Sequence, residues 1–220
     1  LKFELIIVDG YSKDKTLDII ANYVQRLRKI FRENFVRYVV LQENIGIGYA
    51  RNLALREAKG DWIIWVDSDN ILSSDYLESV VKELNSLKND KIALLYPYKV
   101  RPLYQEHNKW SKILACYGLT QEIIKHTPIQ GSLPYTAMQG TVCNTHILRR
   151  IGGFNSKLIA AEDIDLFLRL IRERYGMKPF RATLYYLART SLKSWFIQAM
   201  TWEYGKRLLQ QYAQVNYSIG

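Results

Sequence analysis

The chain has 220 residues, of which 48% are apolar and 13% aromatic, so it can form one large packed domain or two small ones. It contains no run of about 18 apolar residues and no signal-peptide pattern, which argues against a membrane span or an export signal in this sequence. The net charge of +10, from 31 Lys and Arg against 21 Asp and Glu, favours anionic partners.

The basic residues are spread along the chain in ones and twos, without a dense block or a nucleic-acid motif. Nucleic acid is therefore the weaker expectation, behind phosphorylated small molecules and acidic lipid headgroups. Cys116 and Cys143 form no disulfide framework and lack metal-ligand spacing, which favours a reducing compartment. We expect a cytoplasmic protein, either free or peripheral on the cytoplasmic face of the membrane.

Strands and helices alternate in the first half of the chain. The expected order is a strand at 5–8, a helix from about 14, a strand at 35–41, a helix at 49–58, a strand at 62–66, a helix at 74–87 and a strand at 92–96. This alternation predicts an α/β fold with a mostly parallel sheet, right-handed crossovers and helices on both faces.

The alternation stops after Pro97. Residues 101–137 read as an insertion over the sheet, with one helix near 110–126 and no clear strand. The expected elements after it are a strand or turn at 136–144, helices at 146–150 and 161–175, an extended segment at 180–187 and an amphipathic helix at about 191–212.

The strongest local signal is the pair Asp67 and Asp69, directly after the apolar run Trp62–Val66. Ligands of open α/β sheets bind beyond the carboxyl ends of buried strands. Alternation along an extended segment would place both carboxylates on one side of the backbone, where hard oxygen ligands can hold a divalent cation and a diphosphate. The alternative is a solvated turn capped by Asp and Asn.

Three further residues or segments are candidates for nucleotide contacts. Asp9 ends the first strand and either contacts a ligand or caps its turn. Gly46 and Gly48 allow close backbone approach at a helix start, although Arg51 replaces the third glycine of a dinucleotide fingerprint. Arg51 is either a solvated helix residue or a bidentate partner of a diphosphate.

Glu162 and Asp163 begin the helix expected at 161–175. Carboxylates at a helix N-terminus are stabilised by the helix dipole whether or not they have a chemical role. Asp165 is expected to be structural, because Arg169 lies four residues further along the same helix.

Several ordered motifs together resemble glycosyltransferase family 2, the inverting enzymes of the GT-A fold. The similar segments are Leu5–Thr16, Asn44–Asn52, Asp67–Asp69, Gln139–Val142, Ile151–Phe154 and Ala161–Leu166. The resemblance implies a nucleoside diphosphate sugar donor, a hydroxyl acceptor that is lipid-linked or a saccharide, and Mg²⁺ or Mn²⁺. It also implies that Asp9 contacts the nucleotide base, that Asp67 and Asp69 bind metal and diphosphate, and that Asp163, with Glu162 as competitor, is the catalytic base.

On this resemblance, residues 1–190 form the GT-A domain, with a nucleotide-sugar-binding half at 1–98 and an acceptor half at 99–190. Residues 191–220 form a C-terminal helical segment that either packs on the domain or lies on a membrane surface. The chain departs from the family pattern because it begins at what resembles the second strand, and because its three histidines all precede the Glu-Asp motif. Two alternatives remain open: a nucleotidyltransferase on a similar sheet, and a non-catalytic basic module that binds membranes or nucleic acid.

Overall fold

The computed structural model describes residues 3–31, 35–125 and 137–216, and only the helical backbone for 118–125 and 212–216. Most of the proline-rich part of the expected insertion, residues 126–136, therefore lies outside the described residues. The described strands form two sheets. β1 (Leu5–Asp9) and β2 (Val36–Val40) pair in parallel as a two-stranded sheet.

The second sheet is mixed, which corrects the expected mostly parallel sheet. It has the order β3 (Trp62–Ile64), β6 (Val142–Asn144), β5 (Ile92–Leu103), β7 (Gly176–Leu187) and β4 (Asn70–Leu72). Only β5 and β7 pair in parallel, while β6 is antiparallel to both of its neighbours and β4 is antiparallel to β7. The expectation was wrong because β4 follows β3 through a turn with no helix between them, and because β6 follows β5 through the segment that contains α4 yet pairs with β5 in antiparallel orientation.

Strand β5 continues past Pro97, where the sequence analysis ended it at Tyr96. Proline has no N–H to donate to a ladder, but the register of β5 against β7 shifts between Pro97 and Lys99. This bulge accommodates the proline, and both strands reach 12 residues. The extended segment expected at 180–187 is thus the second half of a strand that begins at Gly176.

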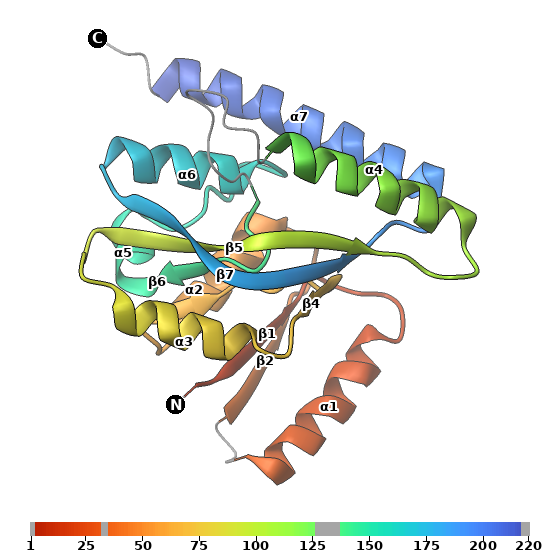
Figure 1. Ribbon diagram of the computed structural model, residues 1–220, viewed down its shortest axis with the longest axis horizontal. Coiled ribbons are helices and arrows are strands. Elements are labelled where there is room, and N and C mark those ends of the chain that lie inside the picture. Colours follow the sequence, from red (N-terminus) through yellow and green to blue (C-terminus); the bar gives the residue numbers. More distant parts are fainter. Residues whose placement is uncertain (1–2, 32–34, 126–136, 217–220) are drawn as a thin grey trace.

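Helices cover both faces of the five-stranded sheet. Figure 1 shows α4, α6 and α7 on one side and α3 on the other. The two-stranded sheet packs through Ile6 and Val8 of β1 against the cluster that contains residues of α2, α5 and α6. The helices are α1 (Thr16–Ile30), α2 (Ile47–Glu57), α3 (Tyr76–Ser86), α4 (Lys109–Lys125), α5 (Thr145–Arg150), α6 (Glu162–Arg172) and α7 (Leu192–Asn216). Among the described residues, none of these helices is long and apolar enough to cross a membrane.

Neighbouring residues of the central strands point into two different hydrophobic clusters. Leu94 and Cys143 join one cluster with residues of α2, α5 and α6, whereas Leu95 and Val142 join another with residues of α3. All four side chains are fully buried. The sheet is therefore buried on both faces, as the unbroken apolar run of β5 predicts.

Candidate active site

Asp67 and Asp69 lie on a turn between β3 and β4. The backbone N–H of Asn70 donates to the carbonyl of Asp67 at 2.9 Å, which closes this turn. The Asn70 side chain accepts from the backbone N–H of Asp67 at 3.2 Å, and donates to Asp69 Oδ1 at 3.0 Å and to Gln139 Oε1 at 3.3 Å. The two carboxylates are thus held together by a braced turn and not by the extended alternation expected from the sequence.

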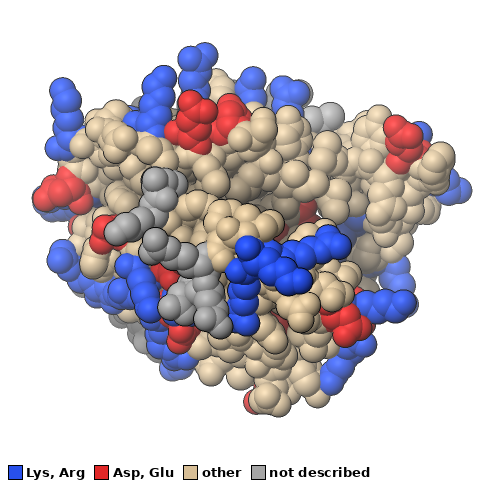
Figure 2. Space-filling view, turned by 90° about the horizontal axis from the view of Figure 1, so that it is seen from below, with Lys and Arg blue, Asp and Glu red and all other residues tan. Residues whose placement is uncertain are grey.

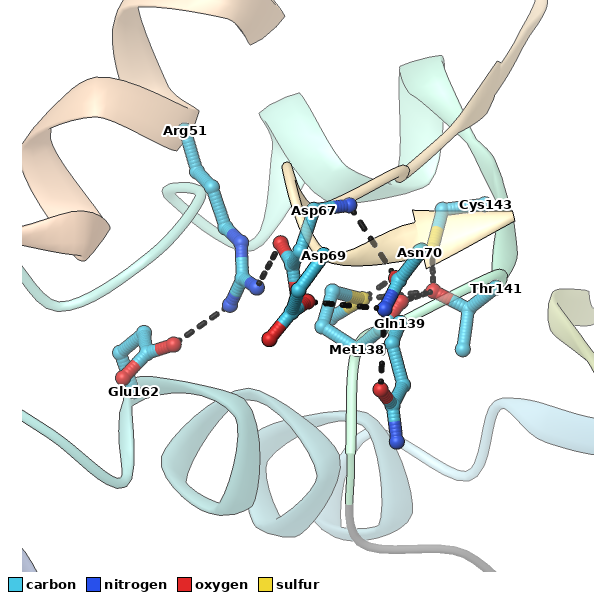
Figure 3. A network of polar contacts seen from close by, with 9 residues as sticks. All are labelled: Arg51, Asp67, Asp69, Asn70, Met138, Gln139, Thr141, Cys143 and Glu162. Carbon is cyan, nitrogen blue, oxygen red and sulfur yellow. Dashed lines mark hydrogen bonds and ion pairs between the residues drawn. The ribbon is translucent and has the colours of Figure 1, made fainter. Parts of the chain in front are cut away.

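The guanidinium of Arg51 connects this turn to the start of α6. Its Nη2 donates to Asp67 Oδ1 at 3.0 Å and its Nη1 donates to Glu162 Oε1 at 2.5 Å (Figure 3). Arg51 is 7% exposed and its guanidinium carbon lies 5.6 Å from the ring centroid of Phe154. Buried arginines of this kind fix the geometry of the carboxylates that they bridge.

Glu162 and Asp163 occupy the first turn of α6, as predicted. Burial raises the pKa of Glu162 to about 7, although the Arg51 charge opposes this rise. The pKa of Asp163 is also raised by burial, against the opposing charge of Arg51, and its Oδ1 accepts from the Ile164 N–H at 2.8 Å. Ala161, just before the pair, adopts a left-handed backbone with φ of 65°, a local strain of the type that accumulates at functional sites.

The turn carboxylates fit a divalent cation through their chemistry. Burial and the neighbouring negative charge of Asp67 raise the pKa of Asp69, while the Arg189 charge lowers it. A cation between two hard oxygen ligands would relieve this repulsion. Among the described residues no three His, Cys, Asp or Glu side chains form a metal-binding group, so a metal held here needs further oxygens from diphosphate or water.

Asp9 caps the turn that follows β1. Its Oδ1 accepts from the N–H groups of Tyr11 and Ser12 at 3.0 and 2.9 Å, and its Oδ2 accepts from the Ser12 hydroxyl at 2.6 Å. The structure therefore shows the turn-capping role that was one of the two alternatives for Asp9. The expected contact of Asp9 with the nucleotide base stays a prediction. Gly48 has a packing role, because a Cβ there would lie 3.0 Å from the Asn155 carbonyl oxygen.

Helix α2 is fastened to the Gly-Gly-Phe turn by Asn52. The Asn52 side chain donates to the Phe154 carbonyl at 2.7 Å and accepts from the Phe154 N–H at 2.8 Å. Gly153 has a φ of 69°, and a Cβ there would collide with the Asn52 side chain. The same turn receives Arg169, which donates to the carbonyls of Ile151 and Gly153 and pairs with buried Asp165 at 2.8 Å. The structural role expected for Asp165 is confirmed.

One large open cavity of about 2750 Å³ is lined by Asp67, Asp69, Glu162 and Asp163. Arg51 and Arg189 line it as well. The face seen in Figure 2 has Lys and Arg spread over it with Asp and Glu among them, so its described residues form no continuous basic patch of the kind that nucleic acid requires.

Sequence reasoning did not predict Gln139 and Arg189 as residues of this site, and it considered Asn70 only as a cap in the alternative of a solvated turn. Asn70 directly follows the Asp pair, and Gln139 begins the family-like segment Gln139–Val142, so both had a local signal. Arg189 had no such signal. Its position beside Asp69 depends on the hydrogen bond from the Leu187 N–H to the Asp69 carbonyl, 2.8 Å long, which joins the end of β7 to the turn.

Comparison with known proteins identifies the family. Residues 1–151 match the family described as glycosyl transferase family 2. An uncharacterized glycosyltransferase of Haemophilus influenzae is 26% identical over 172 residues, 78% of this chain and 53% of the relative; the chain spans about half or less of the first relatives that it matches.

Two solved structures share the fold. The mannosyltransferase PcManGT from Pyrobaculum calidifontis, in complex with GDP-Man and Mn²⁺, has a TM-score of 0.56 at 19% identity, covering 82% of this chain and 47% of that chain. GalNAc-T7 with UDP, GalNAc and Mn²⁺ has a TM-score of 0.62 at 13% identity, covering 86% and 38%. The fold matches GT-A glycosyltransferases. The family match covers more than half of the chain, and the chain therefore belongs to glycosyl transferase family 2.

Proposed function

We propose that this chain transfers a sugar, with inversion, from a nucleoside diphosphate sugar to a hydroxyl of a lipid-linked or saccharide acceptor. The observation that carries the proposal is the convergence of Asp67, Asp69, Glu162 and Asp163 on one cavity, with Arg51 between the two pairs. Family membership leaves the nucleotidyltransferase and the non-catalytic module without support. In this proposal residues 1–98 bind the donor, 99–190 face the acceptor and 191–220 form a separate helical segment.

Asp67 and Asp69 are the residues that would hold Mg²⁺ or Mn²⁺. When bound, the metal neutralises charge on the departing diphosphate. Mn²⁺ accompanies a nucleotide or nucleotide sugar in both similar structures, which supports this assignment. Arg189 would add positive charge beside Asp69, and Asp9 would contact the base from the end of β1.

Asp163 would act as the general base. The acceptor oxygen attacks the anomeric carbon as the bond from that carbon to the diphosphate oxygen breaks, and the acceptor proton passes to Asp163. A raised pKa suits a carboxylate to this task because it increases its affinity for the proton. Glu162, which is buried against Arg51, would instead keep the helix start in position.

The test is incubation of the full-length protein with a panel of nucleotide sugars, with Mg²⁺, Mn²⁺ or chelator, while free nucleoside diphosphate is measured. We expect release from one donor class only, dependent on metal. No release from any donor in the presence of acceptor extracts, by protein shown to be folded, would overturn the proposal.

A further inference from the structure

Helix α7 carries an apolar stripe on the side that faces away from the domain. Leu192, Phe196, Met200 and Tyr204 recur every four residues and are 47 to 57% exposed. The opposite side of α7 is the packed one, where Leu209 contacts Leu158 and a Cβ at Gly205 would lie 2.6 Å from the Ala160 Cβ. About half of the surface of each side chain in the stripe is therefore open to solvent.

Helix α4 extends this apolar surface. Its exposed face bears Trp110, Ile113 and Tyr117, and the Tyr117 ring meets the Trp195 ring of α7 edge to face at 5.7 Å. Figure 1 shows the two helices running alongside each other on one side of the sheet. We call the seven residues Trp110, Ile113, Tyr117, Leu192, Phe196, Met200 and Tyr204 the α4–α7 surface.

The charges around the α4–α7 surface are mostly positive. Over residues 109–117 and 192–211, whose side chains are described, the charged residues are Lys109, Lys112, Lys193, Lys206 and Arg207 against Glu203 alone. Trp and Tyr beside basic residues, on a helix with an apolar stripe, are typical of helices that lie in a bilayer interface. Anionic headgroups complement this charge at about 1 kcal/mol per cation.

The α4–α7 surface adjoins the candidate active site at Tyr117, which lines the same cavity as the four carboxylates. Next to Tyr117, the side of α7 that bears Trp195, Gln198 and Trp202 lines this cavity as well. Phe196 and Met200 do not line it. We propose that the α4–α7 surface docks on an anionic bilayer and that the hydroxyl acceptor is the headgroup of a lipid in that bilayer.

The acceptor part of this inference rests on the proposed function, whereas the docking part does not. Co-sedimentation with phosphatidylserine-containing vesicles should show binding by the parent protein that weakens with salt. The double variant Phe196→Ser with Met200→Ser should lower the partition coefficient on the order of tenfold or more, because two apolar side chains are lost from the interface. Lys193→Gln should weaken binding about fivefold on anionic vesicles and leave binding to neutral vesicles unchanged.

The matched control is Ile19→Ser with Tyr23→Ser, which removes two equally exposed apolar side chains from α1 and should leave binding unchanged. Equal vesicle binding by the parent and by the double variant Phe196→Ser with Met200→Ser would overturn the inference. A parent protein that does not bind vesicles, but is an oligomer that the double variant converts to a monomer, would overturn it as well. Metal-dependent binding of nucleoside diphosphate, measured in the same variants without vesicles, should be unchanged. Its retention separates failure of docking from failure of the proposed transferase.

Discussion

The protonation state of the Glu162 carboxyl group affects the stability of the folded protein. Its pKa rises from 4.5 to about 7 on folding, so between these values the folded protein binds more protons at this residue than the unfolded protein does. Stability from Glu162 is therefore fully present below about pH 4.5 and is lost as pH rises through about 7.

We expect Glu162→Gln to remove this pH-dependent loss of stability. The unfolding free energy of the variant relative to the parent, measured with urea, should be higher at about pH 8 than at about pH 5, by on the order of 1 to 3 kcal/mol. A stability difference that is the same at both pH values would show that Glu162 ionises as an ordinary surface carboxylate.

Arg189 offers a test of donor binding that leaves the core untouched. It is exposed, and its charge acts on Asp69 inside the cavity. Arg189→Ala should weaken nucleoside diphosphate binding about 10- to 150-fold, because an ionic hydrogen bond to phosphate contributes roughly 1.5 to 3 kcal/mol. Unfolding free energy should change by no more than about 0.5 kcal/mol.

Arg181→Ala is the control for Arg189→Ala. Arg181 lies on β7 and is also exposed, but it does not line the cavity. Calorimetric titration of both variants with nucleoside diphosphate and Mn²⁺ gives the comparison. Equal affinities in the two variants would remove Arg189 from the donor site.

At this scale the sequence identified the charged residues but not their partners. Asp67 and Asp69 follow an apolar strand, and Glu162 and Asp163 begin a strongly periodic helix, so local patterns suffice to find them. The bridge from Arg51 to Asp67 and Glu162 spans 16 and 111 residues of sequence. Such contacts depend on how the elements pack, which periodicity does not encode.

At the scale of elements, the hydrogen bonds of Asn52 fasten α2, which carries Arg51, to the turn at 152–154. Asn52→Ala removes both hydrogen bonds to Phe154 and leaves the buried backbone groups of Phe154 without that partner. We expect a loss of about 1 to 3 kcal/mol in unfolding free energy. We also expect lower turnover, because α2 carries Arg51.

Asn85→Ala, at an exposed position of α3, is the matched control and should stay within about 0.5 kcal/mol of the parent in urea unfolding. If Asn52→Ala is as stable and as active as this control, α2 is held by its apolar contacts alone.

Element identity was more predictable than strand pairing. The helices of the described residues, α1 to α7, were all expected near their observed positions, because apolar residues that repeat with helical spacing mark such segments. β4 was missed, since three residues after the Asp pair give too short a pattern, and β5 was ended early at a proline that a bulge accommodates. The antiparallel pairing of β6 has no signature in a three-residue strand.

For the molecule as a whole, we expect the two acid pairs that line one cavity to have different tasks. Asp67 and Asp69 come from the turn after β3 and should bind metal and donor, while Asp163 comes from the start of α6 and should act only during transfer. Arg51 bridges Asp67 and Glu162, so we expect mutations in the two pairs to be coupled through it.

The most direct test is to measure donor dissociation constants and transfer rates side by side for Asp69→Asn and Asp163→Asn. Asp69→Asn should abolish the metal dependence of donor binding. Asp163→Asn should bind donor like the parent and transfer sugar about 10² to 10⁴ times more slowly, the usual contribution of a general base. Asp163→Asn that transfers sugar at close to the parent rate, or Asp69→Asn with unchanged metal dependence, would contradict this division of roles.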